Sequence, residues 1–127
     1  MKKLGDAEFE IMKVIWDSDE SLEANAILDE LKGKRKWALS TLMSSLARLE
    51  KKGFININRT MRYNLYTAII KEEDYKAKES QSFLEKIYDN SLPSLVINLY
   101  NSKTINKDDL SELKELIEDI GKDEDND

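Results

Sequence analysis

Basic side chains are concentrated in residues 32–62, although the chain of 127 residues carries a net charge of −6. Lysine and arginine bind phosphate oxygens, and arginine also pairs with the edge of guanine. Salt screens the acids elsewhere in the chain, so this local excess predicts a surface for nucleic acid. Nine basic residues stand against one acid, Glu50, in this segment: Lys32, Lys34, Arg35, Lys36, Arg48, Lys51, Lys52, Arg59 and Arg62.

Short hydroxyl side chains recur at helical spacing within the same segment. Residues 40–52 are predicted to form a helix whose buried stripe is Leu39, Leu42, Leu46 and Leu49. The opposite face is then expected to carry Thr41, Ser44, Ser45, Arg48 and Lys52. An ordinary solvated face is the alternative interpretation, but such faces usually mix acids and bases.

These side chains are expected to divide the contacts with DNA between them. Thr41 and Ser44 are small enough to approach base edges closely. Arg48 is long enough to reach a base edge and can instead bind phosphate. Lys34 and Arg35 suit phosphates near the start of the helix, and Trp37 either stacks on the backbone or closes the preceding loop. The residues expected mainly on phosphate are Lys36, Lys52, Arg59 and Arg62. Ser45 is expected as a further contact, to a base edge or to a phosphate.

The elements that must position these residues are three helices followed by a hairpin. Helices are predicted over residues 7–16, with Asp6 as N-cap and Trp16 in the core, and over 24–32, ended by Gly33. After Gly53 the period changes to the alternation of strands, over residues 54–59 and 63–69. The predicted fold class is mainly α with a small β-hairpin wing, a winged helix-turn-helix in residues 1–70.

The rest of the chain is predicted to be helical and acidic. Helices are expected over residues 72–88, from Ser91 or Leu92 with Pro93 in the first turn, and after an Asn106 cap until Gly121. Residues 71–121 are too few for a comfortable core, so they pair with a second chain or fold back on the first domain. We favour a homodimer and expect residues 122–127 to be a disordered acidic tail. The expected dimerisation residues are Phe83, Leu84, Ile87, Leu95, Val96, Leu99, Leu113, Leu116, Ile117 and Ile120.

Several function classes lack the residues that they need. The chain contains no cysteine and no histidine, so neither a metal site nor any cofactor is expected, and enzyme activity is disfavoured. The sequence shows no signal peptide and no apolar run long enough to span a bilayer, which predicts a cytoplasmic protein without membrane insertion. A helical adaptor that binds protein through its acidic half remains the alternative from a different class.

Several motifs together resemble the penicillinase repressor family of BlaI and MecI, whose distant relatives include the copper-responsive CopY repressors. The stretch Asp6-Ala7-Glu8-Phe9-Glu10-Ile11-Met12-Lys13-Val14-Ile15-Trp16 is similar to the opening helix of that family. Trp37 and Ser40-Thr41-Leu42 resemble the start of its recognition helix. The run Arg48-Leu49-Glu50-Lys51-Lys52-Gly53-Phe54-Ile55 resembles its passage from helix to wing. The resemblance extends from Leu4 to about Ile120.

This resemblance implies a homodimeric repressor of β-lactamase or related resistance genes that binds palindromic operator DNA. It also implies a membrane-bound β-lactam sensor and protease system, with cleavage of the repressor between Asn98 and Leu99. Two residues depart from the family pattern: Met43 stands where a basic residue is frequent, and Leu99 where phenylalanine is usual. Without cysteines, copper sensing is disfavoured. The alternative is a regulator of the same family with other targets and an antibiotic-independent signal.

Overall fold

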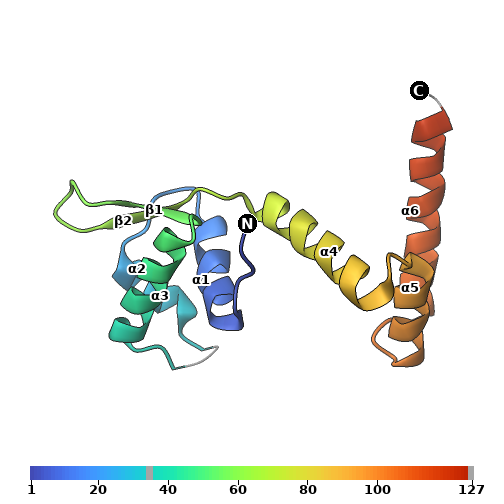
Figure 1. Cartoon of the computed structure of the whole chain (residues 1–127), viewed down its shortest axis with the longest axis horizontal. Helices are drawn as coiled ribbons and strands as arrows, with labels where there is room; N and C mark the ends of the chain where they lie inside the picture. The colour runs from blue at the N-terminus through green and yellow to red at the C-terminus, as the bar shows by residue number, and fades with distance from the viewer. Residues whose placement is uncertain (34–35, 126–127) are drawn as a thin grey trace. The chain divides into compact units, whose positions relative to one another are not determined.

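The computed structural model describes residues 1–33 and 36–125 and confirms the predicted fold class, mainly α with a two-stranded hairpin (Figure 1). Two compact units divide the chain, Met1–Glu79 and Ser80–Asp127. Lys34 and Arg35, predicted to bind phosphate, lie outside the described residues. Across the described ranges, no helix is both long and apolar enough to cross a membrane. The elements are α1 (Asp6–Trp16), α2 (Ala24–Leu31), α3 (Leu39–Lys51), β1 (Ile55–Asn58), β2 (Leu65–Ala68), α4 (Glu72–Tyr88), α5 (Leu92–Asn101) and α6 (Lys107–Asp125).

The ends of α1, α2 and α3 are set by glycines. The N-cap of α1 is Gly5 rather than the predicted Asp6, which is the first helical residue. The Gly5 N–H donates a hydrogen bond of 3.0 Å to the Glu8 carboxylate, which satisfies a donor at the helix start. Gly33 and Gly53 follow α2 and α3 with φ of 102° and 85°, a left-handed conformation that ends helices and favours glycine.

Of two large side chains near the start of α3, the structure places Leu39 against its prediction and Trp37 in one of its two predicted roles. Leu39, predicted in the buried stripe, is 47% exposed. Each helical residue turns by about 100°, so Leu39 lies at the edge of the stripe rather than within it. Trp37 is half-buried and packs against the core. This position favours the role of closing the loop before α3 over stacking on the DNA backbone.

The hairpin is attached to the helices by backbone pairing. β1 and β2 are antiparallel, with Ile55 opposite Ala68 and Asn58 opposite Leu65. The Leu22 N–H donates to the Tyr66 carbonyl at 3.1 Å, and the Tyr66 N–H donates to the Leu22 carbonyl at 2.8 Å. An isolated hairpin is marginally stable in water, so this bridge and the burial of Tyr66 hold the wing in place. Figure 1 shows the loop of the hairpin extending beyond α1, α2 and α3.

Tyr75 of α4 completes the core of the first unit. Its hydroxyl accepts a hydrogen bond of 3.0 Å from the Leu4 N–H, and the side chain is 5% exposed. The boundary between the units therefore falls after Glu79, within α4, and not at the predicted position between residues 70 and 71. The tyrosine ring lies with its centroid 5.7–6.2 Å from those of Phe9, Trp16 and Phe54.

The second unit has the predicted helix starts. The Ser91 hydroxyl caps α5 by accepting a hydrogen bond of 3.2 Å from the Ser94 N–H, with Pro93 in the first turn. The predicted cap Asn106 forms a capping box with Asp109 at the start of α6. The Asn106 side chain accepts from the Asp109 N–H at 3.0 Å, and the Asp109 carboxylate accepts from the Asn106 N–H at 2.8 Å.

The end of α6 differs from the prediction. Gly121 was expected to end this helix and residues 122–127 to be disordered, but the helix continues to Asp125. Gly121 does not adopt the left-handed conformation of a terminating glycine, and no proline follows it, so nothing in the sequence breaks the helix there.

Candidate nucleic-acid interface

The solvent-facing side of α3 combines hydroxyl, apolar and basic side chains. Its buried side is formed by Leu42, Ser45, Leu46 and Leu49. Thr41, Ser44 and Arg48 are exposed, as the helical spacing predicted, and lie on one helix within reach of a common ligand. The remaining exposed residues of α3 are Leu39, Ser40, Met43, Ala47 and Lys51.

Ser45 is not on this exposed side, contrary to the prediction. The residue is 1% exposed, and its hydroxyl accepts a hydrogen bond of 3.1 Å from the Arg48 guanidinium. Ser45 lies between the leucines of the buried stripe, where a small side chain fits. Its hydroxyl therefore orients Arg48, one turn further along α3.

Lys52, which is predicted to contact phosphate, has a carboxylate partner within the fold. Its ammonium group lies 2.7 and 2.8 Å from the two carboxylate oxygens of Glu8, a buried residue of α1. Burial alone would raise the pKa of Glu8, but the hydrogen bonds from Lys52 and the Gly5 N–H, with the positive charges of Lys52 and Arg48, outweigh it and lower this pKa. Lys52 thus neutralises a buried acid and ties α3 to α1. The pairing was not visible in the sequence because the partners are 44 positions apart.

Arg59 forms a two-pronged ion pair with Glu50, the single acid of the basic segment. The two guanidinium nitrogens lie 2.8 and 2.9 Å from the two carboxylate oxygens. The hydrogen bonds from Arg59 lower the pKa of Glu50, and those to Glu50 raise the pKa of Arg59. Both side chains reach solvent, so the pair links the wing to α3 at the surface and can exchange with a phosphate group.

Four other cations keep their charge available for a ligand. Within the described residues, no ion pair involves Lys36, Arg48, Lys51 or Arg62. Arg62 lies in the loop of the wing, with its guanidinium carbon 5.4 Å from the centre of the Tyr63 ring. Lys51 belongs to the basic segment, but it is not among the residues predicted from the sequence to contact DNA. Its position on α3, opposite the buried leucines, is the sequence signal that places it on the exposed face.

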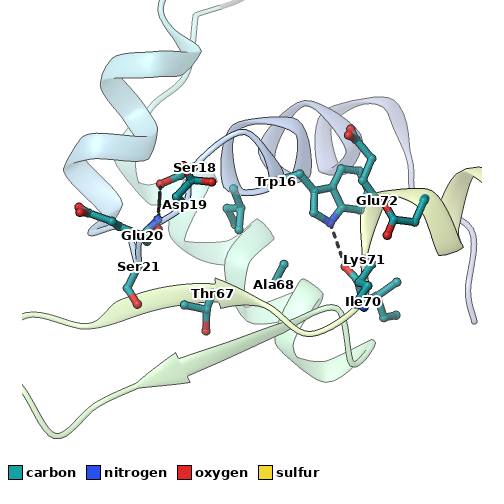
Figure 2. A pocket seen from close by; sticks show the side chains of 12 residues that line it. Trp16, Ser18, Asp19, Glu20, Ser21, Thr67, Ala68, Ile70, Lys71 and Glu72 are labelled. Atoms are coloured by element: carbon teal, nitrogen blue, oxygen red, sulfur yellow. Dashed lines mark hydrogen bonds between the residues drawn. The ribbon is translucent and has the colours of Figure 1, made fainter.

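A hollow elsewhere in the first unit has the opposite charge. It has a volume of about 480 Å³ and lies between the turn after α1 and the segment joining β2 to α4 (Figure 2). Trp16 forms one wall, and its indole N–H donates a hydrogen bond of 2.9 Å to the Ile70 carbonyl. Four acids and one lysine line the hollow, and this excess of acids disfavours phosphate binding there. These charged residues are Asp19, Glu20, Glu72, Glu73 and Lys71.

Comparison with known proteins shows the family to which this fold belongs. The sequence profile of the penicillinase repressor family matches residues 4–119. The penicillinase repressor of Bacillus licheniformis is 36% identical over 121 residues, which cover 93% of this chain and 94% of that protein. The methicillin resistance regulatory protein MecI of Mammaliicoccus sciuri is 31% identical over 115 residues, which cover 91% of this chain and 93% of that protein.

A solved structure of a DNA complex matches the first part of the chain. It is the Bacillus licheniformis BlaI monomeric form bound to the blaP half-operator, 38% identical, with a TM-score of 0.50. The match covers 58% of this chain and 89% of that chain. The chain therefore belongs to the penicillinase repressor family, a family of DNA-binding transcriptional repressors with a winged-helix domain and not of enzymes.

Proposed function

We propose that this chain is a homodimeric repressor of β-lactam resistance genes that binds a palindromic operator. The observation that carries this proposal is the exposed face of α3, which joins hydroxyl groups to unpaired cations on a helix suited to the major groove. The related BlaI monomer, solved with a half-operator, supports duplex DNA as the ligand of this face.

The contacts follow from where the side chains lie. Thr41, Ser44 and Arg48 are assigned to base edges in the major groove. Lys36 and Arg62 are assigned to phosphates on either side of α3, and Arg59 can join them after it leaves Glu50. Phosphate contacts supply affinity and position, whereas the base contacts supply specificity.

Replacing Arg48 by alanine tests the role of this face. If Arg48 reads a base, the variant loses about 1–3 kcal/mol of binding free energy on the operator. Affinities are measured by mobility shift on a duplex that the protein selects from a randomised pool. Lys78→Ala is the matched control, since it removes one exposed charge from α4, outside this face. Full affinity of Arg48→Ala would contradict the assignment.

The second unit is proposed to form the dimer. Many of its large apolar side chains are exposed in the single chain: Phe83, Ile87, Leu92, Ile97, Leu116, Ile117 and Ile120. α5 and α6 also line an apolar groove of about 550 Å³. The other expected dimerisation residues, Leu84, Leu95, Val96, Leu99 and Leu113, are only half-buried in one chain. Covering this surface with a second copy joins two DNA-binding units on the two halves of a palindrome.

Release from DNA is proposed to follow cleavage between Asn98 and Leu99. This bond lies in the last turn of α5, where the Asn98 carbonyl accepts a hydrogen bond from the Ser102 N–H at 3.0 Å. The Leu99 carbonyl accepts another from the Thr104 N–H at 2.9 Å. Because proteases bind extended chains, this turn must unwind before it is cut.

The cleavage proposal is tested in cells that carry a β-lactam sensor protease. The full-length protein is expressed in these cells. Exposure to the antibiotic should produce a fragment ending at Asn98, and mass spectrometry identifies that fragment. A Leu99→Pro variant should give no such fragment, since it removes the normal peptide N–H at the cut. If the operon is induced while the wild-type chain stays intact, the repressor responds to an antibiotic-independent signal instead.

A further inference from the structure

The first half of α3 lacks the side chains that pair with bases through two hydrogen bonds. Its first six residues are Leu, Ser, Thr, Leu, Met and Ser. Two-bond recognition of guanine needs arginine or lysine, and that of adenine needs asparagine or glutamine. In helix-turn-helix proteins it is the N-terminal part of the recognition helix that meets base edges. Bases facing this part must therefore be read by hydroxyl groups or by apolar contact.

An apolar ridge lies along one edge of the exposed face of α3. It consists of Leu39, Met43 and Ala47, which are spaced by four residues and therefore follow one line on the helix. Leu39 and Met43 are 47% and 40% exposed, and Ala47 is exposed as well. Together they form an apolar strip beside the hydroxyl and basic side chains of the same helix.

Met43 is held at its sulfur atom by the wing. The Tyr66 hydroxyl donates to the Met43 sulfur at 3.9 Å, and the tyrosine itself is 2% exposed and fixed in β2. A methionine has three rotatable bonds and loses entropy when a ligand orders it. Contact with a rigid tyrosine reduces that loss, so the exposed methionine is partly ordered before binding.

We propose that Leu39, Met43 and Ala47 read the C5-methyl groups of thymines in the major groove, with Met43 as the main contact. The inference rests on the proposed DNA-binding function and adds a base preference to it. Among the major-groove edges of the four bases, thymine is the one that presents a methyl group. The ridge is flanked on the same helix by hydroxyls and by Arg48 and Lys51, a charge pattern that suits DNA rather than an apolar protein surface.

Replacing thymine by uracil tests the proposal, because the change removes the methyl group and keeps every hydrogen-bonding atom. The probe is a duplex that the full-length protein selects from a randomised pool, with each thymine replaced singly by deoxyuridine. We expect one or two positions in each half-site to lose about fourfold in affinity, since a buried methyl group contributes about 0.8 kcal/mol.

Variants of two methionines identify the side chain that reads the methyl group. In Met43→Ala the uracil penalty should disappear at the position that Met43 contacts. Met61→Ala is the matched control, because Met61 is also an exposed methionine, 59% exposed, but lies in the loop of the wing. That variant should keep the full penalty.

Two results would overturn the inference while leaving the proposed function intact. One is a selected duplex that tolerates uracil at every position, as expected if the ridge serves a protein contact. The other is a penalty that stays unchanged at every position in Met43→Ala. Failure to select any duplex would instead remove the proposed function, and this inference with it.

Discussion

A buried carboxylate is costly unless its charge is matched, and Glu8 is matched on two sides. The Lys52 ammonium lies 2.7 Å from one oxygen, and the Gly5 N–H donates to the same oxygen at 3.0 Å. The pair connects the start of α1 with the C-terminal end of α3, next to the turn into the wing. The basic segment thus includes a lysine whose charge is matched by a buried acid of the fold.

The pH dependence of stability should reveal this pair. In Glu8→Gln the free energy of unfolding at pH 7 should fall by about 1–3 kcal/mol, because Lys52 loses a buried acceptor. The folded state lowers the pKa of Glu8 below its ordinary value of 4.5. Its stabilisation is therefore present above about pH 4.5 and is lost as the pH falls through the lowered pKa. Urea denaturation at several pH values should show the wild-type and the variant converging below pH 4.5.

An exposed acid provides the control for that experiment. Glu30→Gln on α2 removes the same charge from the surface and should leave the free energy of unfolding within about 0.5 kcal/mol of wild type. The contrary result is that the free energies of unfolding of Glu8→Gln and wild type differ by the same amount down to pH 3. That result would rule out the ion pair as the cause of the difference.

Side-chain types were easier to predict than their partners. Helical spacing placed Thr41, Ser44 and Arg48 on the exposed side of α3, where the structure has them. It misplaced Ser45, since a serine gives no hydrophobic signal although it is buried. It also could not show that Lys52 and Arg59 have carboxylate partners, because those pairs depend on how α1, α3 and the wing pack together.

At the scale of elements, α3 and the wing are coupled by the pair of Glu50 and Arg59. An exposed ion pair contributes little to stability, but it decides where the arginine is before DNA arrives. Arg59 is held on the side of α3 by two hydrogen bonds. A phosphate must therefore compete with Glu50 for this arginine.

The salt dependence of DNA binding measures that competition. In Glu50→Gln, Arg59 is free to bind a phosphate, so the affinity for operator DNA should rise. The slope of the logarithm of the association constant against the logarithm of the salt concentration should steepen by about one unit. The double variant Glu50→Gln, Arg59→Ala should lose this extra slope. An unchanged slope in Glu50→Gln, combined with a flatter one in Arg59→Ala, would show that Arg59 already binds phosphate beside Glu50.

Element boundaries were predicted where the local sequence determines them. The structure confirms the helix ends predicted from the glycines after α2 and α3. It also confirms the start of α5 at Leu92, one of the two predicted positions, and the Asn106 cap of α6. The end of α6 was missed because a glycine was read as a terminator although its backbone stays helical. The unit boundary was missed because Tyr75 joins the first core through contacts with residues far away in the sequence.

At the scale of the whole molecule, the two units differ in what they bury. The first has a core of fully buried residues such as Ile11, Leu46 and Phe54. Among the described residues of the second unit, no hydrophobic side chain is fully buried in the single chain. A surface of this kind is rarely left open by a stable protein. The stability of the second unit should therefore depend on the protein concentration.

Replacing Ile117 by lysine tests whether a second copy covers this surface. Ile117 is 56% exposed and lines the groove between α5 and α6, so a lysine there is tolerated in the monomer but would place a charge inside the dimer. Sedimentation at micromolar concentration should show a dimer for wild type and a monomer for Ile117→Lys. The neighbouring Glu118→Gln changes the net charge by the same amount without touching the apolar surface and should remain dimeric.

A dimeric Ile117→Lys variant would place the interface elsewhere. A monomeric one that also loses affinity for a palindrome, but keeps its affinity for a half-site, would tie the second unit to cooperative binding.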